Sequence, residues 1–426
     1  MTLRRFMAIA VLAGMAMVCG GKGPTAPTPT PTPTPSPSPS PQPATASLSG
    51  RVTAADGSPL ASAIVAIVSG TNAGQAATTA ADGTYRFNAL QQGTMTVRAG
   101  ATGFVASGRV VTLSADMVSD FKLETASFTM QGRVFDAVTD EGIGGVAILG
   151  EGFSGTSDQA GTFKIDVGGA NGAPRQATFS SANMVTRQAF LRLPGEDANV
   201  SLIAAGFDLN TFNEMLRAPI LRRWTSPPPL LIERRTLRFV DVNASSATAM
   251  DETMTDAAYD GLLSDLQSAL GSMTGSPGYT FASITERQSA PGSNAQLLNS
   301  STITVARVSG LTQATGFWGY GRWQSNGAGV VVSGIVMLDR DFDTGTSPFI
   351  RTLRAHELGH ALGYNHVTLR ESVMNSSARV APNAFDLAAF RIAFQRKPGN
   401  VAPDTDPSDA TLNSLRFDLT WGPPIR

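Results

Sequence analysis

The chain has 426 residues, a formal net charge of −1 and a single cysteine. This length allows about two to four domains, with a sizeable core in at least one of them. The near-neutral charge argues against nucleic acid or an anionic membrane surface as the main partner. One cysteine excludes a disulfide within the chain, so stability must come from packing or from a bound metal.

Residues 1–20 have the pattern of an export signal. Arg4 and Arg5 supply a positive start, and the apolar run over residues 6–18 is too short to span a bilayer as an ordinary helix. Cys19 ends this run, which resembles a bacterial lipoprotein signal whose cysteine is acylated. A valine precedes the cysteine, where that family has a small residue. Two outcomes therefore stay open: a lipid anchor at Cys19, or cleavage and secretion.

Thr-Pro and Ser-Pro repeats dominate residues 21–45. Because proline fixes φ and removes backbone donors, we expect this segment to be extended and solvated. At about 3.1 Å per residue, roughly twenty such residues reach roughly 60 Å. The segment is therefore predicted to be a semi-rigid stalk that holds the rest of the chain away from a surface.

Residues 46–125 alternate apolar and polar side chains in short runs separated by turn signals, which favours a β-sandwich. Strands are predicted at residues 49–52, 64–68, 85–87 and 95–97. Asp82-Gly83 predicts a hairpin before one of these strands. The order GRV…ADGSPL…AIV…ADGTYRF…LQQG…VRAGATGF resembles the carboxypeptidase regulatory-like fold, a transthyretin-like sandwich. That resemblance says nothing about catalysis.

Residues 126–204 repeat these features and are predicted to be a diverged second sandwich. Gln131 to Val134 repeats the opening strand, and Ser157 to Phe163 repeats the predicted Asp…Gly-x-aromatic hairpin. Two interpretations stay open for both modules. They bind a substrate or a wall component, or they act as spacers that position the rest of the chain.

Residues 205–398 mix helix and strand patterns. Strands are predicted at residues 236–242, 302–308 and 329–338. A helical stripe predicts a helix over residues 255–270, capped by Asp251 or Thr255. Ser347 is predicted to be the N-cap of a second helix and Pro348 its first residue. A last helix is predicted over residues 383–395. Residues 399–426 are polar and aperiodic, so we expect a C-terminal tail in which residues 415–421 can still pack.

All three histidines of the chain lie in one stretch, HELGHALGYNH. His356 and His360 are four apart, so on a helix both imidazoles leave the same face about one turn apart, as two ligands of one zinc ion require. Gly363 allows a positive φ that ends the helix, so that His366 can return as a third ligand. Three protein nitrogens leave a position for water, which is typical of a catalytic site. Glu357 is placed to take a proton from that water.

This pattern, followed by Ser372-Val373-Met374-Asn375, resembles the metzincin clan of zinc endopeptidases. The resemblance implies that the three histidines bind one catalytic zinc ion, that Glu357 is the general base and that Met374 forms an apolar floor. Val367 and Ser376 do not match the residues that mark metzincin subfamilies, so the subfamily stays open. The resemblance also implies that substrate lies extended beside an edge strand, which we predict within residues 329–338.

A second metal signal precedes the histidine helix. Asp339, Asp341 and Asp343 resemble the start of an oxygen-rich calcium loop. The glycine of this loop is one place late for an EF-hand, and Ile350 stands where that loop ends in glutamate. Calcium binding and a solvated loop that leads into the helix both stay open.

The predicted fold is therefore multidomain, with two all-β sandwiches followed by an α+β metzincin-like domain that has a twisted mixed sheet, an active-site helix and a C-terminal helix. The predicted function is a zinc-dependent endopeptidase that acts on protein or peptide substrates. It is expected at the bacterial cell envelope or outside the cell, with membrane contact only through a lipid anchor. Two alternatives are a surface-binding or adhesion protein with a secondary or inactive zinc domain, and a zinc amidase or other hydrolase of a non-peptide substrate.

Overall fold

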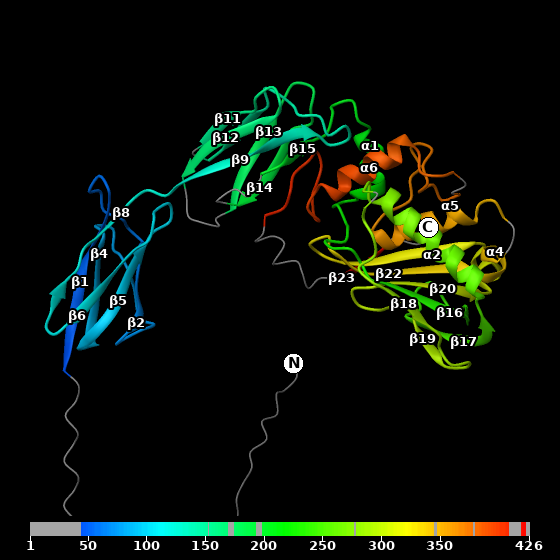
Figure 1. Ribbon diagram of the computed structural model, residues 1–426, viewed down its shortest axis with the longest axis horizontal. Helices are drawn as coiled ribbons and strands as arrows, with labels where there is room; N and C mark the ends of the chain where they lie inside the picture. Colours follow the sequence, from blue (N-terminus) through cyan, green and yellow to red (C-terminus); the bar gives the residue numbers. More distant parts are fainter. Residues whose placement is uncertain are drawn as a thin grey trace, which may run out of the picture. The chain divides into compact units, whose positions relative to one another are not determined.

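The computed structural model describes residues 44–151, 153–168, 174–192, 198–276, 278–344, 347–377, 380–408 and 419–422. Thr45–Arg426 forms one compact unit, separate from Met1–Ala44. The predicted export signal, Cys19 and nearly all of the predicted stalk lie outside the described residues. The described part is rich in β-structure and has few helices, as the sequence predicts (Figure 1).

The first module is a sandwich of two sheets that enclose a single hydrophobic cluster. One sheet has the order β4-β1-β7, with β8 also paired with β1, and the other has the order β3-β2-β5-β6. Buried and exposed side chains alternate at the start of β4, where Tyr85 and Phe87 are buried and their neighbours are exposed. Apolar side chains at every second position therefore place one face of the strand in the core. The strands are β1 (Thr45–Ala54), β2 (Ile64–Gly70), β3 (Ala76–Thr78), β4 (Thr84–Gln91), β5 (Gly93–Gly100), β6 (Ser107–Leu113), β7 (Met117–Val118) and β8 (Phe121–Leu123).

The hairpin prediction at Asp82-Gly83 is wrong, although the turn itself is present. This turn joins β3 to β4, which belong to different sheets, because β3 pairs with β2 and β4 pairs with β1. The carboxylate of Asp82 accepts a hydrogen bond from the Thr84 amide at 3.0 Å and so fixes the turn locally. A turn signal of two residues specifies the local backbone, but it does not specify the strand with which the next strand pairs.

The second module repeats this arrangement. Its sheets have the orders β12-β9-β15 and β11-β10-β13-β14, and they enclose a cluster of their own. The turn that contains Asp158 again joins strands of different sheets, so the second hairpin prediction is wrong for the same reason. The strands are β9 (Ser127–Asp136), β10 (Ala147–Gly150), β11 (Phe153–Thr156), β12 (Thr162–Gly168), β13 (Pro174–Ser180), β14 (Arg187–Arg192) and β15 (Val200–Leu202).

The remainder of the chain is built on one mixed sheet with the order β19-β17-β16-β20-β22-β21-β23, in which β18 also pairs with β16. One large hydrophobic cluster joins α1, α2, α5 and α6 to one face of this sheet (Figure 1). The strands are β16 (Leu230–Arg238), β17 (Ser246–Thr253), β18 (Ile284–Arg287), β19 (Asn294–Gln296), β20 (Ile303–Ser309), β21 (Gly319–Asn326), β22 (Val331–Asp339) and β23 (Leu419–Gly422). The helices are α1 (Leu209–Leu216), α2 (Asp256–Met273), α3 (Leu311–Thr315), α4 (Arg340–Asp343), α5 (Ile350–Leu362) and α6 (Ala384–Phe394).

Two of the predicted helix starts agree with the structure, and one does not. Thr255, not Asp251, caps α2, and Asn383 caps α6, while the Asp386 carboxylate accepts a reciprocal bond from the Asn383 amide. The prediction that Ser347 caps the histidine helix is wrong, because the N-cap of α5 is Phe349. The Ser347 hydroxyl instead accepts a hydrogen bond from the Phe349 amide at 3.2 Å, so the serine shapes the turn before the helix.

The edge-strand prediction is also wrong. The apolar run predicted there forms β22, which lies inside the sheet because it pairs with β20 on one side and with β21 on the other. A continuous apolar run is typical of a strand that is buried on both faces. The strand beside it, β21, runs antiparallel and pairs on its outer side with β23 only at Trp323–Asn326.

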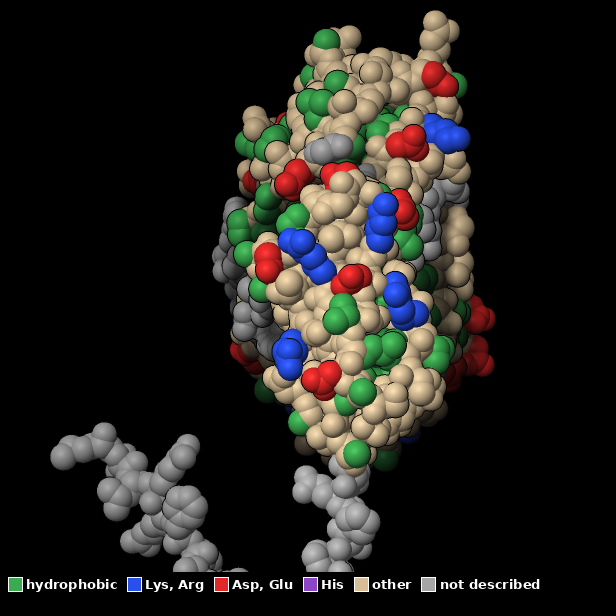
Figure 2. All heavy atoms as spheres, turned by 90° about the vertical axis from the view of Figure 1, so that its left-hand side faces the viewer, with side chains coloured by type: hydrophobic (Ala, Val, Ile, Leu, Met, Phe, Trp, Pro, Cys, Tyr) green, Lys and Arg blue, Asp and Glu red, His purple; other side chains and the backbone are tan. Residues whose placement is uncertain are grey.

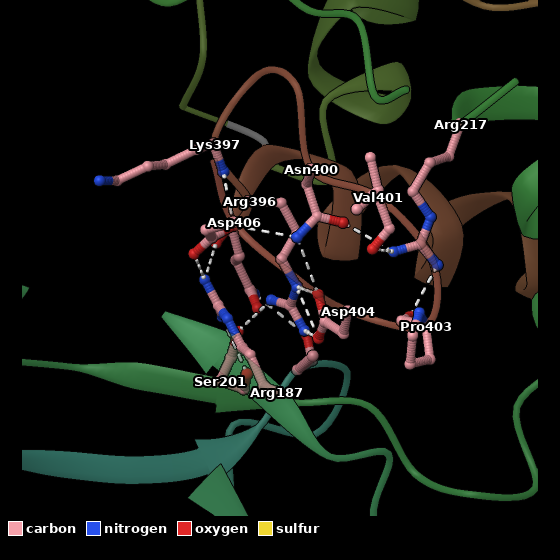
Figure 3. A network of polar contacts seen from close by, with 12 residues as sticks. Arg187, Ser201, Arg217, Arg396, Lys397, Asn400, Val401, Pro403, Asp404 and Asp406 are labelled. Atoms are coloured by element: carbon pink, nitrogen blue, oxygen red, sulfur yellow. Dashed lines mark hydrogen bonds and ion pairs between the residues drawn. The ribbon is translucent and has the colours of Figure 1, made fainter. Parts of the chain in front are cut away.

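A buried polar network joins the second sandwich to the segment that follows α6 (Figure 3). Arg396 forms an ion pair with Asp404 at 2.8 Å, and both side chains are fully buried. Arg187, on β14, forms an ion pair with Asp406 at 2.9 Å. Arg396 also donates to the Ser201 hydroxyl on β15 at 2.6 Å. We call these five residues the interdomain network.

This network corrects the expectation of a polar tail from residue 399. The segment is polar, but Asn400, Asp404 and Asp406 are buried, because their polar groups are paired with one another or with arginine. The predicted boundary near residue 204 also crosses a continuous core. Ala137 and Ile203 belong to the same hydrophobic cluster as α1, α2, α5 and α6. The second sandwich is therefore packed against the helical region, and it is not joined to it by a linker.

We predict that Asp404→Asn destabilises the protein by about 3–5 kcal/mol, because the Arg396 guanidinium stays buried without its carboxylate partner. Chemical denaturation measures the change. The matched control is Asp140→Asn, since Asp140 forms an exposed ion pair with Arg391 at 4.0 Å and its loss should have little effect. Equal stability of the two variants would show that the interdomain network does not hold the modules together.

Candidate metal centre

Helix α5 positions two of the three histidines, and the turn after it positions the third. His356 and His360 are buried on α5, which ends at Leu362. Gly363 follows in the left-handed region, with φ of 115°, and a Cβ there would lie 2.8 Å from the carbonyl oxygen of Arg222. Only glycine fits both the backbone conformation and the space. The chain then reverses and brings His366 back to the helix.

Each of the three imidazoles turns its Nε2 atom toward a common centre. The Nε2 atoms of His356 and His360 lie 3.1 Å apart. The Nε2 atom of His366 lies 3.1 Å from that of His360 and 3.3 Å from that of His356. The structure thus brings together the three residues that the sequence predicts as ligands.

Two backbone carbonyls fix the direction of these rings. The Nδ1 atom of His356 lies 2.7 Å from the carbonyl oxygen of Val373, and Nδ1 of His360 lies 2.8 Å from that of Tyr364. A carbonyl can only accept, so Nδ1 must carry the hydrogen, and the Nε2 lone pair of each neutral ring points at the shared centre. Burial lowers the pKa of His356 to about 4, and it lowers the pKa of His360 well below its usual value, with a smaller contribution from His356 and His366.

This donor set fits a zinc ion. Neutral imidazoles that turn their Nε2 lone pairs toward one another have no hydrogen to share, so a cation at the centre satisfies them. Ligands at about 2.0–2.1 Å in tetrahedral geometry are about 3.3 Å apart, close to the separations found here. Within the ranges that the structure describes, His356, His360 and His366 form the one group of three or more His, Cys, Asp or Glu side chains that converge in this way.

Glu357 lies between α5 and β21. Its side chain is buried, and burial raises its pKa to about 8, with a partly opposing hydrogen bond from the backbone of Gly321. A Cβ at Gly319 would lie 2.7 Å from Oε1 of Glu357, and a Cβ at Gly321 would lie 2.8 Å from Cβ of His360. The two glycines therefore let β21 approach the helix at the carboxylate. Neither glycine belongs to a sequence motif, so this role cannot be predicted from the sequence.

The turn at Met374 lies directly beneath α5. Met374 is fully buried, and its Sδ would lie 2.6 Å from a Cβ at Gly359. Asp386, at the start of α6, accepts hydrogen bonds from the Ser372 hydroxyl at 2.6 Å and from the Val373 amide at 3.0 Å. Because the Val373 carbonyl orients His356, Asp386 helps to hold this predicted ligand in place. The sequence signals only the capping role of this aspartate, since its partners in the Met374 turn come from another element.

The three aspartates of the suggested calcium loop do not converge. Asp343 is buried and forms ion pairs with Arg307 and Arg354, at 2.5 and 2.8 Å. Asp339 caps α4 through the amides of Asp341 and Phe342. The carboxylate of Asp341 pairs with Arg340 at 2.5 Å. This arrangement favours a structural role for the loop in anchoring α4 and α5.

Residues 47–124 match the family model of the carboxypeptidase regulatory-like domain. The first sandwich is similar to domains of this family. The resemblance inferred for residues 46–125 is therefore confirmed. The match does not extend to the histidine-bearing region, where the interpretation depends on the motif and on the geometry described above. No curated protein matches the chain significantly.

Comparison with solved structures finds partial matches. The Bacillus anthracis TIE protein has 16% identity and a TM-score of 0.27 over 38% of this chain and 33% of that one. A cohesin–X-dockerin complex from Acetivibrio cellulolyticus has 18% identity and a TM-score of 0.17 over 19% of this chain and 58% of that one. The shaft pilin SpaA from Lactobacillus rhamnosus GG has 11% identity and a TM-score of 0.19 over 38% of this chain and 97% of that one. The chain thus spans less than two thirds of the first two, and these scores are too low to carry an argument about function.

No helix in the described ranges is long and apolar enough to cross a membrane. On the face drawn in Figure 2, basic and acidic side chains are interspersed, and the described residues there form no continuous patch of either sign. That face therefore offers no surface of a single charge.

We predict that Glu357 makes the metal-free protein lose stability as pH rises. Its pKa is about 8 when folded against 4.5 for a solvated carboxyl, so the folded state binds the proton more tightly. The resulting stability is complete below pH 4.5 and is lost as pH rises through 8. Glu357→Gln does not titrate and keeps both histidine ligands on α5. Its stability relative to wild type should therefore grow by about 1 kcal/mol or more between about pH 5 and about pH 8.

Urea unfolding of both proteins in the presence of a chelator measures this difference. Because both proteins keep all three histidines, their titration cancels in the comparison. A constant difference in the free energy of unfolding across this pH range would show that the Glu357 carboxyl is solvated in the folded state.

Proposed function

We propose that the protein is a zinc-dependent endopeptidase of the metzincin type. The observation that carries the proposal is the convergence of three Nε2 atoms, 3.1 to 3.3 Å apart, two of them from a helix that also carries the buried Glu357. The carbonyls of Val373 and Tyr364 orient two of the ligands, and the Met374 turn supports the helix from below. The same features in the same order mark the metzincin motif.

Within this site each residue has a distinct task. A zinc ion bound by the three histidines would polarise the scissile carbonyl and lower the pKa of a water molecule. Glu357 takes the proton from that water at its carboxylate and then delivers it to the departing amine. Burial raises the pKa of Glu357 in the metal-free protein, and a zinc ion bound nearby would lower it again, so that the carboxylate is available to accept a proton.

The substrate is proposed to lie along β21. An extended peptide can add a strand to an exposed sheet edge. Within the described residues, β23 covers this edge only at Trp323–Asn326, and no strand pairs with Gly319–Arg322 on that side. The latter stretch contains the two glycines that contact the zinc-binding helix. A peptide paired there would have its scissile bond near Glu357.

We predict that the wild type binds about one zinc ion per chain and cleaves casein or gelatin in a chelator-sensitive manner. Glu357→Gln should keep its zinc and stay folded while cleavage falls by about a hundredfold or more, because only the proton carrier is lost. His366→Ala should lose both zinc affinity and activity. Zinc analysis, melting temperature and turnover are measured side by side.

Each outcome separates the alternatives. Zinc binding without cleavage of any protein or peptide would favour the adhesion role or hydrolysis of a non-peptide substrate. Full activity of Glu357→Gln would show that this residue is not the base. Loss of zinc from Glu357→Gln as complete as that from His366→Ala would show that the glutamate is a ligand.

We also propose that the protein is exported, and that Cys19 either carries a lipid anchor or is lost with a cleaved signal. The support is the signal pattern of residues 1–20 and the proline-rich segment that follows. If Cys19 is acylated, Cys19→Ser should move the protein from the membrane fraction to the soluble fraction. If wild type and variant both appear in the medium, the signal is simply cleaved.

A further inference from the structure

The third ligand differs from the other two because it does not lie on a helix. His366 lies in the loop between Gly363 and the Met374 turn, so its position depends on contacts made by that loop. Backbone bonds within the loop account for part of its order, since the Val367 amide donates to the Met374 carbonyl at 2.9 Å. Asn375 and Asn383 donate to the carbonyls of Arg370 and Glu371 further along, while Thr368 and Leu369 are bound by α1.

The carboxylate of Glu214 binds the loop just beyond Val367. Glu214, in the last turn of α1, accepts hydrogen bonds from the Thr368 amide at 3.0 Å and from the Thr368 hydroxyl at 2.6 Å. It also accepts a bond from the Leu369 amide at 3.3 Å. Hydrogen bonds to an ionised carboxylate are stronger than neutral ones. Glu214 thus binds the chain two and three residues beyond the third ligand.

Helix α1 contacts the loop on the other side of His366 as well. The Asn365 amide donates to the carbonyl oxygen of Met215 at 2.8 Å. Further along the loop, Arg370 forms an ion pair at 3.5 Å with Asp208, the N-cap of α1. The residues that flank the third ligand are therefore bound to one short helix.

Helix α1 is itself held rigidly. Phe212, Met215 and Leu216 are buried in the large hydrophobic cluster. Arg217, at its C-cap, donates to the Asn400 side chain at 2.6 Å and to the carbonyl of Pro403 at 3.0 Å, which places it beside the interdomain network (Figure 3). A ligand loop attached to this helix is attached to the rigid part of the molecule.

We propose that Glu214 is a positioning residue for the metal site, which fixes His366 by binding the backbone and hydroxyl that follow it. The proposal depends on the zinc-binding function argued above. Groups that orient metal ligands contribute to metal affinity although they do not contact the metal, and their loss typically weakens binding by about 10- to 100-fold. Without Glu214 the loop must be ordered when the metal binds, and the cost of that ordering lowers the affinity.

The experiment compares four variants of the full chain: Glu214→Ala, Thr368→Val, the double variant, and Glu371→Ala as a matched control. Glu371 is exposed on the same loop, so its replacement removes an equal charge from that loop while the contacts of Glu214 stay in place. Zinc dissociation constants are measured by competition with a chromogenic chelator. The visible spectrum of the cobalt-substituted protein reports the geometry of the site independently of activity. The melting temperature in chelator reports the fold.

We expect Glu214→Ala to weaken zinc binding by about tenfold or more and to change the cobalt spectrum, while Glu371→Ala changes neither. Thr368→Val should weaken binding less. In the Glu214→Ala background it should have a smaller effect than in the wild type, because the two side chains share one hydrogen bond. The melting temperature in chelator tests whether Glu214 has a general structural role instead. In that case Glu214→Ala would lower the melting temperature but leave the cobalt spectrum of the loaded protein unchanged.

Unchanged zinc affinity and an unchanged cobalt spectrum in Glu214→Ala would overturn the positioning role and leave the zinc site intact. An equal loss of affinity in Glu371→Ala would overturn it too, because the effect would then be general electrostatics. Failure of the wild type itself to bind zinc would instead refute the proposed function. The two proposals therefore fail in distinguishable ways.

Discussion

The hydrogen bonds from two histidine rings to backbone carbonyls are the constraint on which the site depends. Val373 and Tyr364 accept from Nδ1 and so leave Nε2 of His356 and His360 facing the centre. The carbonyl of Tyr364 is available because Gly363 ends the helix just before it. The carbonyl of Val373 is in place because Asp386 holds the amide of the same residue. The orientation of these two rings is thus set by the end of α5, the start of α6 and the turn between them.

Other parts of the fold hold these elements in position. Glycines on β21 allow the sheet edge to contact α5 at Glu357, and Arg354 ties the back of the same helix to Asp343 and Asp265. The second sandwich contributes to the same core through Ala137 and Ile203. Buried ion pairs are costly to desolvate and add little net stability, but removing one partner is strongly destabilising. Losing one partner of an ion pair in the interdomain network therefore costs more free energy than the pair contributes to folding.

Features that depend on local spacing could be predicted from the sequence. The four-residue interval between His356 and His360 and the glycine at position 363 are enough to bring two rings together and to end the helix. Features that depend on contacts between distant segments could not. The apolar run that forms β22 gives no indication of its two neighbours, and the polar residues after 398 give no indication that they pair with Arg187 and Arg396. The role of Glu214 could not be predicted for the same reason, because its partner Thr368 is 154 residues away in the sequence.

The most direct test of the zinc-site account is anomalous diffraction at the zinc absorption edge, from crystals of the protein grown with zinc. The account predicts one strong peak about 2.0–2.1 Å from the Nε2 atoms of His356, His360 and His366, with the carboxylate of Glu357 outside bonding distance. A peak bonded to Nδ1 of any of these rings, a peak at other residues only, or no peak at all would contradict it.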